Sequence, residues 1–506
     1  MTTITKICRV CNQSFEIDDV DQAYYAKRQV PLPTLCPKDR LKKRLVFRNE
    51  RKLYQRNCAT TNKPIISNVR PEAPFPVIHV DEWHKQKHEV PCLEKFDFAR
   101  PFFDQYAELW PKPTRMHKAS AGNEENSEYS NHCGNCRNCY FIFNSEFDED
   151  CMYLKFGDKC RDCVDCTNII DSELCYECVN VKNCYNLKFS DDCDTCSDSA
   201  FLRNCRGVKN SMFCYGIDHK EFCLFNEQLT REEYKKRTAE FSLNSFANVE
   251  RCMQGWDGWS NKWPKIRHVI LNSENCTGES VFNSKNARDC YNVTKLEDCR
   301  YMMNSADIKD SYDIFAYGMR TALCYECITI AYDYDIKFCT YCFESNNIEY
   351  CESCWGCKDC FGCIGLKKAQ YHILNKPYTE AEYKELLPKI KEHMIATKEY
   401  GEFFPEKFSL FQYEDSLAQD YFPIAIEKSA ANIPAGTLTT DQVQDKIEDV
   451  PADLYEKTFL CPIEQKPFKF QKKEIQFHKK IGVALPRVSF EPRYQRRSKY
   501  VPFPYV

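Results

Sequence analysis

This sequence of 506 residues has no long apolar segment. It contains no run of 18 apolar residues, so we expect no membrane-spanning helix. Residues 1–15 lack the basic-then-apolar pattern of a signal peptide, so we expect a cytoplasmic protein. Phosphate-binding, dinucleotide-binding, serine-hydrolase and zinc-protease motifs are also missing. The sequence therefore gives no positive case for an enzyme, and its formal charge of -4 leaves any affinity for nucleic acid to local patches.

Cysteine is abundant, with 34 residues. Fifteen lie between Cys133 and Cys223, each a multiple of three residues from every other, and most also share a nine-residue register. A fixed short period is typical of a repeat architecture, in which each unit buries its face against its neighbours. Because thiols stay reduced in the cytosol, we expect free cysteines; a secreted disulfide ladder is the alternative.

The local pattern inside the repeats favours strands. Tyr185, Leu187 and Phe189 alternate with polar residues, and Asp191 and Asp192 follow as a turn. Nine residues suit a short strand and a corner, so two such units predict a coil of about 18 residues, as in nonapeptide rolls. The chain lacks their Gly-Gly-x-Gly-x-Asp pattern and has only 15 glycines, so we do not expect calcium. We predict a parallel β-solenoid with cysteines as small buried ladder residues; a stack of irregular metal knuckles is the alternative.

The repeat region is duplicated. Cys175-Tyr-Glu-Cys178 recurs 149 residues later as Cys324-Tyr-Glu-Cys327. Each copy ends in a charged helix that begins with a capping box, Thr230 with Glu233 and Thr379 with Glu382. Side-chain stacking at corners explains the Asn and Asp residues that precede many cysteines: Asn135, Asn138, Asp162, Asp165, Asn183 and Asn204.

These patterns predict a mainly β chain: two tandem parallel β-solenoid-like repeat arrays with helical caps, flanked by small α+β modules of the treble-clef or zinc-ribbon type. The predicted parts are a zinc module with a basic helix (1–60), an extended Pro- and aromatic-rich connector (61–125), the first array with its helix (126–247), the second array with its helix (248–400), a linker (401–455) and a degenerate zinc-ribbon-like module with a basic tail (456–506).

The strongest chemical signal is a metal site in the first 60 residues. Cys8 and Cys11 form a C-x2-C knuckle, and Cys36 precedes a helical run. A knuckle and a ligand at a helix start are typical of zinc sites, because the tight turn directs both sulfurs inward. Asp39 stands where a fourth cysteine is usual, and zinc accepts a carboxylate oxygen. We predict Zn²⁺ bound by Cys8, Cys11, Cys36 and Asp39, although an Asp in the first helical turn also complements the helix dipole.

One further segment matches this module, and another offers a possible second metal site. Residues 468–493 match residues 15–40, but Glu464 and Phe490 replace thiols beside Cys461, so this copy is expected to fold without metal. A second site around Cys58 is the weaker hypothesis, and surface histidines on a loop are its alternative. Its candidate ligands are Cys58, His79, His84, His88 and Cys92.

Nine basic residues lie between Lys38 and Arg56, with apolar residues interleaved. A basic helix that projects from a zinc module commonly binds phosphate backbone, and guanidinium groups suit phosphate geometry. A solvated helix face is the alternative. We predict RNA or a ribonucleoprotein as partner, bound by Arg40, Lys42, Lys43, Arg44, Arg48, Arg51, Lys52 and Arg56, with Arg493, Arg496 and Arg497 of the C-terminal tail.

Cysteine triplets such as Cys133, Cys136 and Cys139 resemble iron–sulfur spacing. The remote Cys-Pro of a ferredoxin does not follow, and the phase of the repeats alone gives the same spacing. We therefore favour ladder packing or occasional zinc capture over a cluster.

Several motifs resemble a known family. They include the runs from Val30 to Arg40 (VPLPTLCPKDR), from Phe47 to Arg51 (FRNER) and from Phe98 to Phe103 (FARPFF), together with the repeated CYEC. Over nearly the whole chain they are similar to an uncharacterised family of cysteine-rich, zinc-ribbon-like proteins from candidate-phylum bacteria. Its members are sometimes labelled CoA-transferase-like, a name that none of these residues supports. The resemblance implies zinc binding and no established activity. That family often has Cys-Pro-x-Cys at the helix start, where this chain has Asp39.

The combined hypothesis is a cytoplasmic, non-enzymatic, zinc-containing scaffold. Its end modules would engage RNA or a ribonucleoprotein, and its solenoids would present an aromatic, polar face to a protein partner. One alternative is a redox or metal-handling protein whose cysteines cycle. Another is a protein-interaction platform that binds no nucleic acid.

Overall fold

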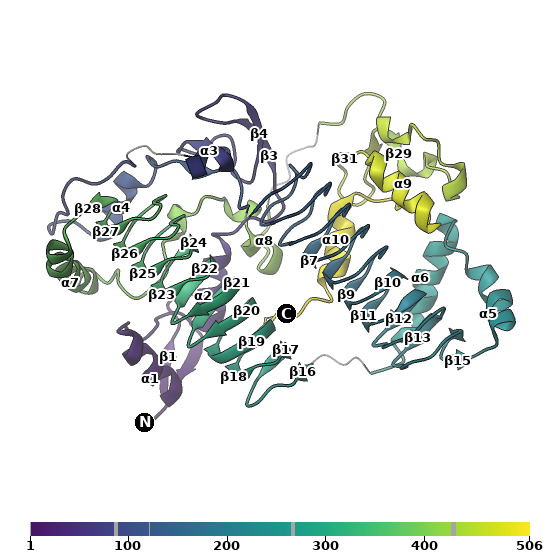
Figure 1. Cartoon of the computed structure of the whole chain (residues 1–506), viewed down its shortest axis with the longest axis horizontal. Helices are drawn as coiled ribbons and strands as arrows, with labels where there is room; N and C mark the ends of the chain where they lie inside the picture. The colour runs from purple at the N-terminus through teal and green to yellow at the C-terminus, as the bar shows by residue number, and fades with distance from the viewer. Residues whose placement is uncertain (1, 86–89, 121, 265–268, 427–431, 506) are drawn as a thin grey trace. The chain divides into compact units, whose positions relative to one another are not determined.

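The computed structural model describes residues 2–85, 90–120, 122–264, 269–426 and 432–505. Within these ranges strands predominate over helices, and most strand pairs are parallel, which confirms the prediction of a mainly β fold. The chain divides into two compact units (Figure 1). Unit 1 comprises Met1–Ala119, Arg267–Ile426 and Pro502–Val506, and unit 2 comprises Ser120–Ile266 and Glu427–Val501.

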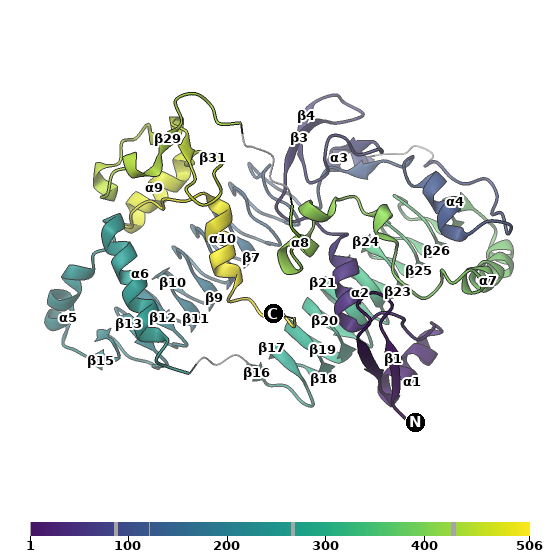
Figure 2. The ribbon, with the colours of Figure 1, turned by 180° about the vertical axis from the view of Figure 1, so that it is seen from behind.

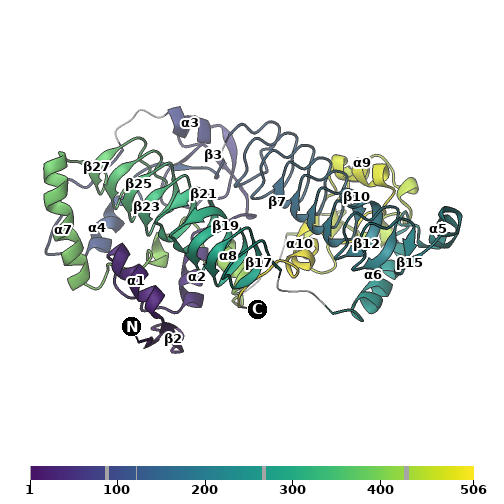
Figure 3. The same ribbon diagram turned by 60° about the horizontal axis from the view of Figure 1, so that its bottom comes forward.

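Unit 2 contains a stack of parallel strands and bridges between Ser120 and Gln228, called the β7–β15 array, in which the last strand, β15, is antiparallel. Each segment pairs with the segment twelve residues later, as in Thr167 with Val179 and Ala200 with Met212. Figure 3 shows these strands as successive rungs. The strands are β7 (Lys155–Asp158), β8 (Thr167–Ile170), β9 (Val179–Lys182), β10 (Tyr185–Lys188), β11 (Asp191–Asp194), β12 (Ser197–Arg203), β13 (Met212–Tyr215), β14 (Cys223–Leu224) and β15 (Glu227–Gln228).

Cysteines fill the interior of this array. Cys163 is 0% exposed, and its thiol donates hydrogen bonds to the carbonyls of Arg161 and Ser172, two residues before it and nine residues after it. Such thiols are small hydrophobic groups with a weak donor, which suits a narrow core. The predicted 18-residue coil is wrong, because the ladder register is twelve. The cysteines are spaced by multiples of three residues, and nine, twelve and eighteen are all such multiples. The spacing therefore could not distinguish these repeat lengths.

Every third residue of the array adopts the left-handed conformation. Asn135, Asn138 and Asp162 have φ angles of 54°, 58° and 49°. Asn and Asp tolerate this region better than most residues. Their side chains also bond along the stack: the Asn168 amide donates to Asn180, twelve residues later, at 2.7 Å. The left-handed φ angles fit the predicted corner positions, whereas the Asp165 side chain pairs with Arg493 and Arg497 instead of stacking along the array.

Unit 1 contains the corresponding β16–β28 array. Its register is twelve over most of its length, but it is eleven where Ile270 pairs with Val281, and thirteen where Ile308 pairs with Thr321 and Tyr312 pairs with Tyr325. The strands are β16 (Ile270–Leu271), β17 (Gly278–Phe282), β18 (Lys285–Arg288), β19 (Cys290–Arg300), β20 (Met303–Lys309), β21 (Tyr312–Ala322), β22 (Tyr325–Ala331), β23 (Tyr334–Lys337), β24 (Thr340–Phe343), β25 (Asn346–Glu349), β26 (Lys358–Phe361), β27 (Gln370–Ile373) and β28 (Lys376–Pro377).

Both arrays end in an antiparallel strand pair and a helix. Thr230 caps α5 (Arg231–Thr238) and Thr379 caps α7 (Glu380–Ala396), and each threonine exchanges hydrogen bonds with the glutamate three residues on. The two predicted capping boxes are therefore confirmed. In unit 2, α6 (Phe246–Ser260) follows α5 and packs its Trp256 against Phe201 and Phe213 of the array.

A small module packs on each array. In unit 1 it consists of β1 (Ile4–Ile7), β2 (Ser14–Ile17), α1 (Asp19–Arg28) and α2 (Pro37–Leu45). In unit 2 it consists of β29 (Leu438–Thr439), β30 (Phe459–Leu460), β31 (Pro467–Phe468), α9 (Lys472–Ile481) and α10 (Phe490–Ser498). Figure 2 shows α2 beside the β16–β28 array and α10 beside the β7–β15 array.

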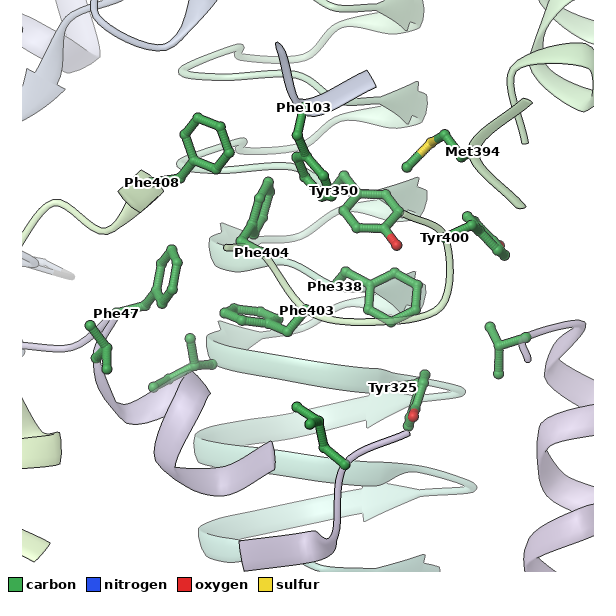
Figure 4. Close-up of a cluster of buried hydrophobic side chains, with 14 of the residues drawn as sticks. Phe47, Phe103, Tyr325, Phe338, Tyr350, Met394, Tyr400, Phe403, Phe404 and Phe408 are labelled. Atoms are coloured by element: carbon green, nitrogen blue, oxygen red, sulfur yellow. The ribbon is translucent and has the colours of Figure 1, made fainter. Parts of the chain in front are cut away.

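The segment predicted as an extended connector, 61–125, instead carries regular structure. It holds β4 (Pro64–Ser67), β5 (Val77–Ile78), α3 (Val80–Lys85), α4 (Phe102–Leu109) and β6 (Arg115–Met116), and β4 pairs with β3 (Tyr54–Asn57). The first part of the predicted linker is also packed: Phe403, Phe404 and Phe408 are buried in an aromatic core with Phe103 and Tyr350 (Figure 4). Residues 427–431 of that linker lie outside the described ranges.

Candidate metal centre

The N-terminal hairpin places two thiols on one tight turn. β1 and β2 pair in antiparallel fashion, and the Cys8 amide donates to the Gln13 carbonyl at 2.8 Å. Asn12 has a φ of 59° and donates from its amide to the Cys8 carbonyl, which closes the turn. This geometry brings Cys11 back beside Cys8, as the C-x2-C spacing predicts.

The other two candidate ligands come from the start of α2. Cys36 is the N-cap, Pro37 begins the helix, and Asp39 lies in the first turn. Proline suits this position because the first helical amides have no partner inside the helix. The Cys36 amide donates to the Cys8 sulfur at 3.3 Å, which fixes the helix start against the hairpin.

The four donor atoms converge. The Cys8 sulfur lies 3.0 Å from Asp39 Oδ2, the Cys36 sulfur lies 3.3 Å from the same oxygen, and the Cys11 and Cys36 sulfurs lie 3.8 Å apart. All four donors lie within 4.8 Å of one another. A tetrahedral centre with metal–sulfur bonds of about 2.3 Å places its sulfurs about 3.8 Å apart. The cluster could therefore hold a metal ion with little rearrangement.

Burial differs among the ligands and sets their protonation. Cys8 and Cys36 are 0% and 8% exposed, whereas Cys11 lies at the surface. Burial raises the pKa of the Cys36 thiol to about 12. Burial alone would also raise the pKa of the Asp39 carboxyl, but hydrogen bonds from the three thiols lower it. Without a metal the Cys11 and Cys36 thiols, whose pKa values are raised, thus keep their protons beside an ionised carboxylate. Metal binding must release these protons, so affinity should rise with pH.

A second hairpin repeats the knuckle with fewer donors. The Cys58 amide donates to the Lys63 carbonyl at 2.9 Å, as Cys8 does to Gln13, and Thr61 takes the place of Cys11. The His79 amide donates to the Cys58 sulfur at 3.4 Å, as Cys36 does to Cys8. Sequence analysis missed this repeat, although the shared pattern of a knuckle followed by a helix offered a signal.

The structure does not assemble the predicted second metal site. The His79 ring stacks on His117 with 4.6 Å between centroids, and the His84 ring packs on Trp355 at 4.9 Å. Cys92 lies beside Glu94, and His88 falls outside the described residues. Within the ranges that the structure describes, the Cys8 cluster is the one group that meets the geometry of a metal site.

A third knuckle lies in the unit 2 module. The Cys461 amide donates to the Lys466 carbonyl at 2.9 Å. Glu464 stands where Cys11 stands in unit 1, and it accepts a hydrogen bond from Ser489, the N-cap of α10. In unit 2 a glutamate and a serine thus link the knuckle to the start of the helix, as thiols do in unit 1.

The basic helix α2 faces the β16–β28 array of its own unit. Arg40 and Arg44, 2% and 1% exposed, both pair with Asp313 at 2.9 Å. Glu326, on the neighbouring strand β22, lies 3.7 Å from Arg40. Burial raises the pKa of Glu326 to about 7, although the two guanidinium groups oppose this shift. The helix is therefore docked by a buried cluster of opposite charges.

The other cations of this segment also have partners within unit 1. Arg48 pairs with Glu50 at 3.0 Å, Lys43 lies 3.6 Å from Glu402, and Arg51 pairs with Asp420. Lys42 lies over the Tyr413 ring and Arg56 donates to the Arg70 carbonyl. Lys52 differs, because it is its backbone amide and not its ammonium that donates to Asn49. The structure thus buries Arg40, Arg44, Arg48 and Arg51, at most 6% exposed, against acidic partners in their own unit.

The C-terminal cations hold the small module of unit 2 against the array of the same unit. Arg497 lies 3.0 Å from both Asp165 and Glu177, and Arg493 pairs with Asp165 and with Glu474. Arg496, whose side chain is 42% exposed, also pairs with Glu177.

Aromatic rings complete the two docking sites. Arg493 lies over the Tyr153 ring at 4.9 Å, and Arg40 lies over the Tyr301 ring at 5.1 Å. The duplication of about 149 residues thus relates the docking surfaces as well as the strands. Sequence analysis missed these acids, although shifts of 148 and 149 residues relate Asp165 to Asp313 and Glu177 to Glu326.

Comparisons with known proteins add little. No family model matches the chain, and none of the curated proteins compared with it matches either. One solved structure, a "putative acetyltransferase" from Desulfovibrio desulfuricans G20, shares 11% identity over 48% of this chain and 63% of its own length, with a TM-score of 0.11. Among the described helices, none is long and apolar enough to cross a membrane.

Proposed function

We propose that this chain is a non-enzymatic, zinc-containing scaffold. In this proposal the two arrays are parallel β-solenoids, and each carries a treble-clef-like module docked by paired arginines. One Zn²⁺ ion, bound by Cys8, Cys11, Cys36 and Asp39, holds the N-terminal module together. The observation that carries the proposal is the convergence of four donors within 4.8 Å.

The donor set favours a structural zinc. Three thiolates and one carboxylate supply four ligands, which closes a tetrahedral site and leaves no position for a substrate. Two of the sulfur ligands are buried, and Cys36 and Asp39 belong to the helix that docks on the β16–β28 array. The ion would therefore stabilise the fold of the module and the orientation of its docking helix.

The array thiols support a scaffold better than a redox or metal-handling protein. They are free and buried, and they donate hydrogen bonds to backbone carbonyls, as Cys342 does to Thr340 and Cys351. Redox-active cysteines need solvent access, which these buried positions do not offer.

A protein is the partner that the surface favours. Tyr332 and Tyr334 of the β16–β28 array are 51% and 50% exposed, and Phe147 and Tyr185 of the other array are 51% and 45% exposed. Exposed aromatic residues are enriched in protein interfaces. RNA binding, as predicted from the basic segment, would have to use cations at the surface, such as Lys38 and Arg496.

Metal analysis of the purified full chain tests the proposal. We expect about one zinc per chain, and substantially less in Cys8→Ser and Asp39→Ala, because each removes one of four ligands. Cys461→Ser is the matched control, since it alters the corresponding thiol of the third knuckle and should leave the metal content unchanged. Equal zinc content in all four proteins would reject the site, and many metal equivalents per chain would favour a metal-handling protein.

A further inference from the structure

The thiols of this chain differ sharply in their access to solvent. Of its 34 cysteines, Cys11 is exposed, Cys92 and Cys276 are partly buried, and the others are buried. Oxidants in solution react with accessible thiolates, so among chemically similar sulfurs the exposed one reacts first. Cys11 is therefore the first site that a small oxidant reaches.

A second thiol is positioned to complete the reaction. The Cys36 sulfur lies 3.8 Å from the Cys11 sulfur and is shielded in the module. Cys8 is 0% exposed, and its sulfur is held by the Asp39 carboxylate and the Cys36 amide. An accessible thiolate beside a buried resolving thiol is the arrangement of a redox sensor.

We propose that Cys11 is a peroxide-reactive site and that Cys36 resolves it to a disulfide. The inference rests on the metal centre proposed above, because a cysteine that binds a metal is deprotonated. The Cys11 thiolate attacks a hydroperoxide, which breaks the O–O bond, forms a sulfenic acid and releases hydroxide. The Cys36 thiolate then attacks the Cys11 sulfur, which forms the S–S bond and releases a second hydroxide. The two sulfurs lose two electrons in total, and the peroxide accepts these two electrons.

Oxidation would remove the metal from the module. The disulfide uses two of the three sulfur ligands and leaves Cys8 and Asp39, too few donors for a closed tetrahedral site. Because Cys36 is also the N-cap of α2, the change occurs at the start of the helix that carries Arg40 and Arg44. Peroxide would thus act on the docking helix without touching the array thiols.

The test uses the full chain, purified under reducing conditions and transferred to anaerobic buffer. Hydrogen peroxide is added at a few equivalents, zinc release is followed with a chromogenic chelator, and disulfides are mapped by mass spectrometry. We expect one zinc to be released for each Cys11–Cys36 disulfide formed, and dithiothreitol to reverse both. Cys92→Ser and Cys276→Ser are the controls and should behave as the wild type.

Several outcomes would overturn the inference. These are earlier modification of Cys92 or Cys276, a Cys8–Cys11 disulfide, or zinc release without a disulfide. In Cys11→Ser we expect no disulfide between Cys8 and Cys36 on the same timescale. Mass spectrometry detects this disulfide whether or not the variant binds metal. Zinc content before oxidation tests the proposed function separately. A loaded protein that resists peroxide would reject the switch alone, and a reduced protein without metal would reject both.

Discussion

Arg44 is the residue at which the docking of α2 can be tested most directly. We consider Arg44→Met, which removes the charge and keeps much of the side-chain volume. Arg44 is 1% exposed and lies 2.9 Å from Asp313, which is 0% exposed. Removal of one partner from a buried ion pair typically costs about 3–5 kcal/mol, because the remaining charge loses its compensation. Arg40 still pairs with Asp313 at 2.9 Å. We therefore expect the free energy of unfolding to fall by the low end of this range, about 3 kcal/mol.

Urea unfolding of the full chain at pH 7 measures this effect, with hydrogen exchange to separate the transitions of the two units. With a slope of about 2 kcal/mol per molar urea, the midpoint of unit 1 should fall by about 1.5 M. The matched control is Lys42→Met on the same helix. Lys42 is partly exposed and contacts the Tyr413 ring at 5.6 Å, so its loss should cost less than about 1 kcal/mol.

The opposing hypothesis predicts a different result. If Arg44 contacts phosphate, Arg44→Met should unfold as the wild type does and should lose retention on immobilised RNA. That outcome would refute the docking role argued here. Arg497→Met, the counterpart in unit 2, should lower the midpoint of unit 2 and leave that of unit 1 unchanged.

Two further substitutions test the array interiors. Burial and nearby thiols raise the pKa of Asp148 well above its usual range, so its contribution to stability is full below about pH 4 and is lost as pH rises through the folded pKa. Asp148→Ser, which can still accept from the Cys160 amide, should therefore stabilise unit 2 more at pH 8 than at pH 4; equal effects in urea unfolding would contradict this. Gly362→Ala should destabilise unit 1 by about 1–3 kcal/mol in thermal unfolding, because its Cβ would lie 2.8 Å from Phe102. Gly216→Ala, with a similar φ and open space, should cost less.

Much of the architecture was predictable because it depends on short-range rules. Because every third residue faces the interior, the cysteines recur at multiples of three residues. The left-handed corners favour Asn and Asp. A helix that begins with Thr and has Glu three residues later shows its cap within four residues. The knuckle at Cys8 and the helix start at Cys36 are each local motifs, so the ligand set could be proposed before their meeting was seen.

The sequence by itself determined the parallel repeats, the capped helices and the four candidate ligands, since each is recorded in residues close together along the chain. The tertiary structure alone decided the twelve-residue register, because the three-residue spacing of the cysteines fits several registers and only the pairing of the strands distinguishes them. It also decided which groups the arginines of the basic helix pair with. Asp313 and Glu326 lie more than 260 residues from the arginines that they neutralise, and a local charge pattern carries no information about so distant a partner.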